Sequence, residues 1–170
     1  DAVGLICFSN AIHNFTPPRS GVRHVNRLLH AAFDQHASFV ESRYDKAFLH
    51  LRTHCRKRSL VVLITNVIDE INARQIRQYL TAIGKHHLPL GVLLRDHRIF
   101  DAIDDYVARP TPEEPERYYP AAVAAKLVNW RQQVLADLHH RGALTLDVFP
   151  EDLTTSLVNR YLEIKARHLL

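Results

Sequence analysis

Residues 58–70 read RSLVVLITNVIDE, and this stretch decides the fold class. A basic residue is followed by a run of strand-forming apolar residues that ends at Thr65 and Asn66. Uninterrupted apolar strands are typical of parallel sheets that are covered on both faces. Ligands of such sheets usually lie just beyond the carboxyl ends of the strands. The stretch therefore predicts a buried strand at 59–65 and directs the search for a site to the residues after it.

The rest of the chain alternates between strand and helix patterns. Apolar runs predict further strands at 2–8, 88–95 and 143–149, and a short edge strand within 9–21 that Pro17 and Pro18 close. Apolar residues at helical spacing predict helices at 19–35, 42–57, 71–83 and 97–107, a long helix that Gly142 ends, and a last helix from Pro150 to Leu170. Residues 108–120 hold four of the eight prolines and predict a loop.

This alternation predicts one α/β domain over residues 1–170, with three layers and a doubly wound, mostly parallel sheet. We expect residues 2–8, 59–65 and 88–95 to be parallel strands of that sheet. The chain has no methionine and opens directly in a strand pattern, so we interpret it as a fragment of a longer protein.

The composition is that of a soluble globular protein, with 46% hydrophobic and 24% charged residues. No apolar run approaches the ~20 residues that span a bilayer. Cys7 and Cys55 are too few for a disulfide framework. No phosphate-binding glycine motif and no nucleophile paired with a base is recognisable, so we expect no cofactor and no catalytic residue.

Polar residues follow the predicted strands at the edge where ligands usually lie. They are Ser9, Asn10, Thr65, Asn66, Asp69, Arg95 and Asp96. Two carboxylates in this set suit a hard cation, which takes oxygen ligands. Asn, Asp, Ser and Thr also cap helices and turns routinely, and this simpler interpretation is favoured.

Two other clusters have simple alternatives. His50 and His54 are four residues apart on a predicted helix, as in a metal site, but no third ligand is evident. The basic residues Arg52, Arg56, Lys57 and Arg58 could bind phosphate, but they also complement the carboxyl end of a helix dipole, and this simpler interpretation is favoured.

Several stretches together resemble the bacterial domain of unknown function 58 family. They are VGLICFSNAI, PPRSG, RSLVVLITNVID, KHHLPLGVLLRD and VNRYLEIKARHLL, in order along nearly the whole chain. The core of that family is similar to a von Willebrand factor A domain. The resemblance implies the C-terminal part of such a domain, without its first central strand.

The resemblance implies a degenerate metal site. The Asp-x-Ser-x-Ser motif of von Willebrand factor A domains would lie before residue 1, their Thr falls near Ser42, and their later Asp falls at Asn66. Loss of that carboxylate removes charge that a divalent cation needs, so we expect no bound metal. The absent strand would lie between residues 2–8 and 59–65, and would leave two inner strand edges bare unless association covers them.

The function implied by the resemblance is non-enzymatic. Family members occur with membrane-anchoring portions and beside MoxR-type AAA ATPases, so we expect a protein-interaction domain in assembly or chaperone-like work. The parent protein would be anchored at the cytoplasmic face of the membrane, although this fragment would not contact the membrane. The expected binding surface is Ser9, Asn10, Ser42, Asn66, Asp69, Arg95 and Asp96.

Two alternatives remain open from the sequence. One is a metal-dependent hydrolase that uses Asp69, Asp96 and a histidine such as His97. The other is nucleic-acid binding by the basic residues at 52–58, which predicts affinity that falls steeply with salt.

Overall fold

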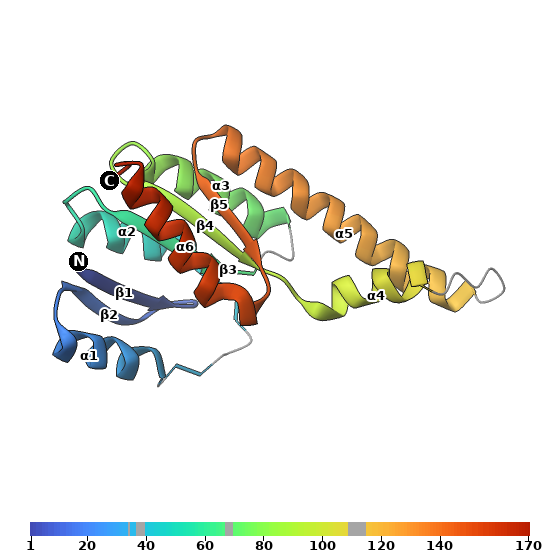
Figure 1. Ribbon diagram of the computed structural model, residues 1–170, viewed down its shortest axis with the longest axis horizontal. Coiled ribbons are helices and arrows are strands. Elements are labelled where there is room, and N and C mark those ends of the chain that lie inside the picture. Colours follow the sequence, from blue (N-terminus) through green and yellow to red (C-terminus); the bar gives the residue numbers. More distant parts are fainter. Residues whose placement is uncertain (34, 37–39, 67–69, 109–114) are drawn as a thin grey trace. The chain divides into compact units, whose positions relative to one another are not determined.

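The computed structural model describes residues 1–33, 35–36, 40–66, 70–108 and 115–170. The chain forms two compact units, Asp1–Lys57 and Arg58–Leu170, which are described separately below (Figure 1). That residues 1–170 form one domain stays a prediction.

The first unit contains a two-stranded antiparallel sheet. β1 (Val3–Phe8) pairs with β2 (Ile12–Arg19), with Leu5 opposite Thr16 and Cys7 opposite Asn14. The loop between them is short enough that the Ser9 amide donates to the Ala11 carbonyl at 2.9 Å. Such a short connection permits only antiparallel pairing.

This pairing gives residues 2–8 a neighbour. They form a strand as expected, and among the described residues β1 and β2 make a sheet of their own, apart from the sheet of β3, β4 and β5. The expected parallel arrangement of residues 2–8 with 59–65, with an absent strand between them, stays a prediction. β2 is also longer than the short edge strand that was predicted, and it includes Pro17 and Pro18. Proline is compatible with this position because β2 has one neighbouring strand.

Two helices complete the first unit. α1 (Val22–Phe33) is attached through His24, whose Nε2 lies 2.7 Å from the Val3 carbonyl oxygen. α2 (Tyr44–His54) lies within the predicted helix at 42–57 and buries Tyr44, Ala47 and Phe48. The Tyr44 ring meets the Phe8 ring edge to face at 5.6 Å, which packs α2 against β1.

The second unit is built around a parallel sheet in the order β3–β4–β5. Its elements are β3 (Leu60–Thr65), α3 (Glu70–Ile83), β4 (Leu88–Leu94), α4 (His97–Ala108), α5 (Pro115–His140), β5 (Leu144–Val148), the 3₁₀ turn η1 (Pro150–Asp152) and α6 (Leu153–Ala166). The parallel pairing expected of residues 59–65 and 88–95 is confirmed, with Leu63 opposite Gly91.

Helices cover both faces of the central strand. Figure 1 shows α6 over one face of the sheet and α3 and α5 over the other. Leu90, Val92 and Leu93 of β4 are fully buried between them. Gly91 leaves room for α3 and α5, because a Cβ there would lie 3.2 Å from Leu80 Cδ1 and 3.9 Å from Leu138 Cδ1.

β3 is less buried than the sequence predicts. Leu63 is 7% exposed, but its neighbour Ile64 is 47% exposed. β3 ends the three-stranded order, and within the described part of the second unit β4 is its one neighbouring strand. The apolar run correctly predicts a strand but overestimates how completely it is covered.

Helix ends follow local chemistry. α3 stops before Gly84, and α5 stops before Gly142, whose φ of +82° is the left-handed conformation that glycine adopts easily. The predicted loop at 108–120 is too long, because α5 already begins at Pro115, a residue that suits the first turn. Residues 109–114 of that loop lie outside the described residues.

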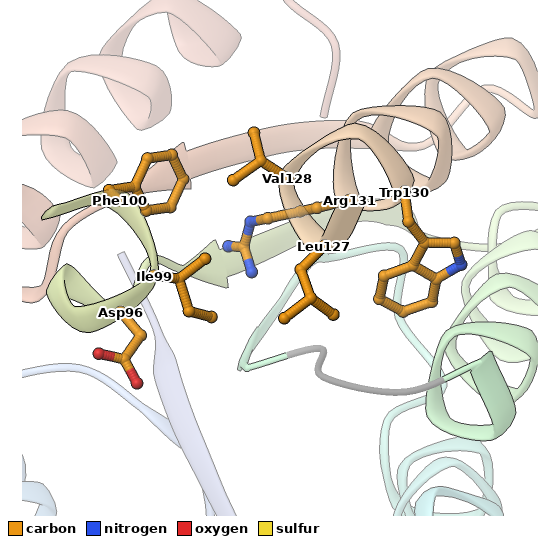
Figure 2. Close-up of a pocket in the computed structure, with 7 residues that line it drawn as sticks. All are labelled: Asp96, Ile99, Phe100, Leu127, Val128, Trp130 and Arg131. Carbon is orange, nitrogen blue, oxygen red and sulfur yellow. The ribbon is translucent and has the colours of Figure 1, made fainter. Parts of the chain in front are cut away.

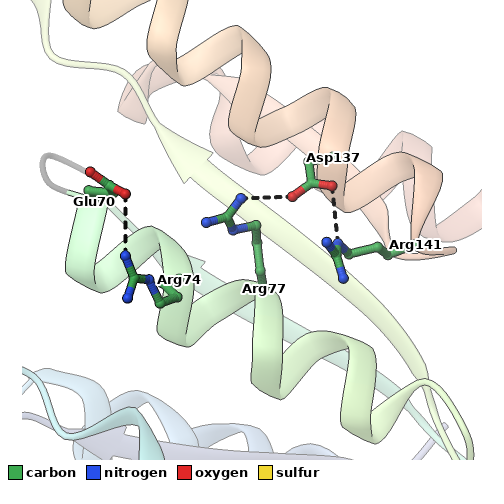
Figure 3. A network of polar contacts seen from close by, with 5 residues as sticks. All are labelled: Glu70, Arg74, Arg77, Asp137 and Arg141. Atoms are coloured by element: carbon green, nitrogen blue, oxygen red, sulfur yellow. Dashed lines mark hydrogen bonds and ion pairs between the residues drawn. The ribbon is translucent and has the colours of Figure 1, made fainter.

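A polar network joins α3 to α5 (Figure 3). Arg77 Nη1 donates to Asp137 Oδ2 at 2.8 Å, and Arg141 Nε donates to Asp137 Oδ1 at 3.1 Å. Arg77 first, and then Arg141, hold the pKa of Asp137 below its usual value of 3.8. Glu70 and Arg74 form a separate exposed pair within α3.

Candidate functional site: the carboxyl ends of the parallel strands

The carboxyl ends of β4 and β5 meet at one edge of the sheet. The Arg95 amide, directly after β4, donates to the Val148 carbonyl at the end of β5 with a distance of 2.8 Å. Parallel strands create this meeting point. It places Arg95 and Asp96, both predicted from the sequence, beside Asp147 and Phe149 of the neighbouring strand and its exit.

Asp147 lies between two arginines. Its Oδ1 accepts from Arg131 Nε at 3.0 Å and Nη2 at 2.8 Å, and its Oδ2 accepts from Arg95 Nε at 3.1 Å. Arg131 comes from α5 and also donates to the Leu94 carbonyl at 2.8 Å. Two guanidinium groups therefore share one carboxylate, and these three side chains together carry one net positive charge.

Aromatic rings hold the Arg95 side chain. Its Cζ lies 5.1 Å from the centre of the Phe100 ring and 5.4 Å from that of Phe149. These two rings meet edge to face at 5.5 Å. Stacking of this kind favours a guanidinium and fixes its plane.

An exposed histidine extends this cluster. The His97 ring stacks on Phe149 at 4.2 Å, and its Nε2 lies 2.5 Å from Glu151 Oε1. A hydrogen bond from its own backbone amide lowers the pKa of Glu151, and His97 lowers it further. We call the surface formed by Arg95, Asp96, His97, Phe100, Phe149 and Glu151 the β4–β5 rim.

A small hollow of about 30 Å³ lies beside the rim between α4 and α5 (Figure 2). Its lining is mostly apolar, with Ile99, Phe100, Leu127, Val128 and Trp130 joined by Asp96 and Arg131. Figure 2 shows the Arg131 side chain extending from α5 toward Ile99 and Phe100.

Asp96 acts as a helix cap. Its Oδ1 accepts a hydrogen bond from the Arg98 amide at 3.0 Å, in the first turn of α4. The favoured interpretation of the strand-end residues as caps therefore fits Asp96.

Asn66 lies at the end of β3 and is exposed. Asp69, the next predicted residue of this set, lies outside the described residues. Within the part of the chain that the structure describes, no group of three or more His, Cys, Asp or Glu side chains is placed to hold a metal ion. Asp96 and His97, named for the hydrolase alternative, contact Arg98 and Glu151 respectively.

Ser9, Asn10 and Ser42 belong to the first unit, with Ser9 and Asn10 in the β1–β2 turn and Ser42 just before α2. The Arg43 amide donates to the Ser9 carbonyl at 2.8 Å, and Lys46 Nζ donates to the Asn10 carbonyl at 3.1 Å. Ser9 Oγ contacts Asn10 Oδ1 at 3.1 Å. These contacts tie the β1–β2 turn to the start of α2.

The histidine pair on α2 is stacked. The rings of His50 and His54 lie 4.0 Å apart, and Phe15 packs against both. Burial, and to a lesser extent the charge of His54, lower the pKa of His50. In the basic run, Arg58 donates to the Leu169 carbonyl at 3.1 Å.

Sequence reasoning missed Arg131 and Asp147, although both left a signal. Arg131 lies on the buried stripe of α5, four residues after Leu127 and three before Val134. Asp147 interrupts the apolar run at 143–149. A charge on a buried stripe and an opposite charge in a buried strand are the pattern of a buried ion pair.

A protein-family model described as "Protein of unknown function DUF58" matches residues 1–101. This match covers more than half of the chain. The chain belongs to this family. The DUF58 match runs from β1 into α4 and includes Arg95 and Asp96 of the rim. No curated protein and no solved structure matches the chain. None of the described helices combines the length and apolar character needed to cross a bilayer.

Proposed function

We propose that this DUF58 domain is a non-enzymatic protein-interaction domain that binds its partner through the β4–β5 rim. The partner is a MoxR-type AAA ATPase, and the work is assembly or chaperone-like. The observation that carries the proposal is the side chain of Arg95, which is held in place by Asp147 and two phenylalanine rings at an exposed edge.

Arg95 is suited to an interface because its position is fixed before binding. Its side chain is 31% exposed, and one nitrogen, Nε, is used to bind Asp147. Among the residues that the structure describes, its two terminal nitrogens have no recorded hydrogen-bond partner. A fixed guanidinium binds a carboxylate through two hydrogen bonds, and loses little side-chain entropy in doing so.

The rim also has the composition of an interface. Arginine and aromatic side chains dominate the residues that contribute most to protein–protein binding. Phe100 and Phe149 supply the apolar part, and Asp96, His97 and Glu151 surround it with polar groups. The rim therefore favours a partner with a carboxylate beside an apolar side chain.

The identity of the partner and the location rest on the family resemblance. Members of the family that this chain resembles are encoded beside MoxR-type ATPases and carry membrane-anchoring portions. We accordingly place the domain at the cytoplasmic face of the membrane, as part of a longer anchored protein, with the degenerate metal site at Asn66 inherited from the von Willebrand factor A pattern.

Calorimetric titration tests the proposal. The MoxR-type ATPase encoded in the same genome is titrated into the wild-type chain, Arg95→Ala and Arg95→Lys. We expect Arg95→Ala to weaken binding about tenfold or more, because a charged hydrogen bond is lost. The affinity of Arg95→Lys should lie between those of the wild type and Arg95→Ala, because lysine keeps the charge but not the planar guanidinium.

Arg141→Ala is the matched control. Arg141 is a half-exposed arginine paired with one aspartate, and it lies just before β5, at the other end of that strand. Its loss should leave the affinity unchanged. No binding by the wild-type chain, or equal losses in Arg95→Ala and Arg141→Ala, contradicts the proposal.

A further inference from the structure

Arg131 of α5 is a buried arginine with one unused nitrogen. Its side chain is 8% exposed. Its Nε and Nη2 donate to Asp147, and Nη2 also donates to the Leu94 carbonyl. Within the described residues, Nη1 donates to no acceptor. A buried N–H group without an acceptor is costly, so this nitrogen needs an acceptor from outside the described residues.

The hollow between α4 and α5 is the space that this nitrogen can reach. Nη1 is not completely enclosed, and Arg131 lines the hollow. Figure 2 shows its guanidinium group among Ile99, Leu127 and Val128, which line the same hollow. The volume of about 30 Å³ has room for about two water molecules, or for the two oxygen atoms of one carboxylate. The hollow therefore fits a small acceptor group.

The charge at the hollow favours an anion. Arg95, Arg131 and Asp147 together carry one net positive charge, because two guanidinium groups share one carboxylate. Asp96 also lines the hollow, but its Oδ1 accepts from the Arg98 amide, and Figure 2 shows its carboxylate pointing away from Arg131. An anionic acceptor would form a charge-assisted hydrogen bond with Nη1, which is stronger than a bond to a neutral acceptor.

The remaining walls of the hollow are apolar. They are formed by Ile99, Phe100, Leu127, Val128 and Trp130. Such walls exclude water and pack against methylene groups, so they suit a carboxylate that is carried on a short aliphatic chain. A phosphate or sulfate ion has no apolar part and needs more donors than the one free nitrogen of Arg131.

We propose that the hollow binds the side-chain carboxylate of a glutamate of the partner protein, with Arg131 Nη1 as the donor. This inference rests on the proposed function for the presence of a partner. Arg95 would bind one carboxylate of the partner at the β4–β5 rim, and Arg131 would bind a second one in the hollow. The partner surface would therefore carry two neighbouring acidic side chains.

Trp130 gives a direct readout of the hollow, because it lines the hollow and is the only tryptophan of the chain. Glutamate and glutamine, each capped by N-acetyl and C-amide groups, are titrated into the complete chain at constant ionic strength. NMR follows the indole N–H signal of Trp130. We expect capped glutamate to shift this signal with a dissociation constant in the millimolar range, because few contacts are gained. Capped glutamine should bind about tenfold more weakly, because it carries no charge.

Arg131→Lys and Arg141→Lys form a matched pair of variants. Both arginines are paired with an aspartate of the same unit. Lysine at position 131 has a single nitrogen, which Asp147 would take, so the affinity for capped glutamate should fall about tenfold or more. Arg141→Lys should bind like the wild type.

Ile99→Phe keeps Arg131 and fills the hollow with a larger side chain. It should also remove the shift of the Trp130 signal, because the carboxylate then has no space. This second variant keeps the proposal testable if Arg131→Lys does not fold.

Three results would overturn the proposal. The first is equal binding of capped glutamate and capped glutamine, or binding of neither, which would mean that the hollow holds water alone. The second is unchanged binding of capped glutamate by both Arg131→Lys and Ile99→Phe. The third is binding of propionate without binding of capped glutamate, which would make the ligand a free small carboxylate. These measurements contain no ATPase, so their failure is distinct from a failure of the ATPase to bind the rim.

Discussion

Asp147 joins Arg131 and Arg95 through its two carboxylate oxygens, Oδ1 to Arg131 and Oδ2 to Arg95. This single carboxylate connects α5, β5 and the residue after β4. The Arg131 side chain is 8% exposed and that of Asp147 is 12% exposed, so the pair is nearly out of solvent. Replacing one partner of such a pair leaves the other charge buried without a counter-charge, whereas replacing both partners does not.

The first prediction concerns this pair. Asp147→Leu should lower the free energy of unfolding by about 3 kcal/mol, because it leaves the buried Arg131 without a carboxylate. Arg131→Met should cost less, because Asp147 keeps Arg95 as a partner. The double variant should lose about 1 kcal/mol less than the sum of the two, because the buried Arg131 charge is then absent. Urea denaturation of all four proteins gives the coupling energy. A coupling energy near zero would mean that the pair contributes no stability as a unit.

The second prediction compares neighbours in β3. Leu63→Asp should lower the free energy of unfolding by more than about 3 kcal/mol, because the new carboxylate is buried without a partner. Ile64→Asp should cost about 1 kcal/mol or less, since Ile64 is largely exposed. Thermal melts compare the two midpoints. Equal midpoints would show that the two faces of β3 are equally covered.

The third prediction concerns pH and the α3–α5 network. The pKa of Asp137 is lowered chiefly by Arg77 and next by Arg141, so its pairing stabilises the fold above about pH 4. That contribution is lost as the pH falls through the lowered pKa. NMR titration of the Asp137 carboxyl should give a pKa below 3.8 in the wild type. Arg77→Ala should raise it more than Arg141→Ala, and the reverse order would contradict the geometry.

The fourth prediction concerns Asn66. We expect the wild-type chain to bind neither Mg²⁺ nor Mn²⁺ with useful affinity, and Asn66→Asp not to restore binding by itself. Mg²⁺ takes about six oxygens in near-octahedral order, and one added carboxylate does not supply that set. Calorimetric titration with both ions measures this. Micromolar binding by the unmodified chain would revive the metal-dependent hydrolase.

Local patterns predicted the elements well. The apolar runs at 59–65 and 88–95 became paired parallel strands, and the helix predicted at 42–57 became α2. Gly142 ended α5 as expected, because its left-handed conformation suits glycine. These features depend on neighbouring residues in the chain, which a sequence displays directly.

Features that depend on distant partners were harder to predict. Whether β1 pairs with β2 or with a parallel strand is decided by the length of the connection and by which edges are available, and an apolar run does not record either. Arg95 packs against Phe100 of α4 and Phe149, which follows β5. This contact exists only because the fold brings the end of β4, α4 and the end of β5 together. The identity of Arg95 as a site residue was predicted, but the aromatic clamp and Asp147 were not.

The most direct test of the account is a hydrogen-exchange footprint of the chain bound to the MoxR-type ATPase. If the β4–β5 rim is the binding surface, amides at 95–101 and 147–151 should exchange more slowly in the complex. Amides at 84–87 and 141–143, before β4 and β5, should exchange at unchanged rates. Protection confined to those segments before the strands, or no protection at the rim in a formed complex, would contradict the account.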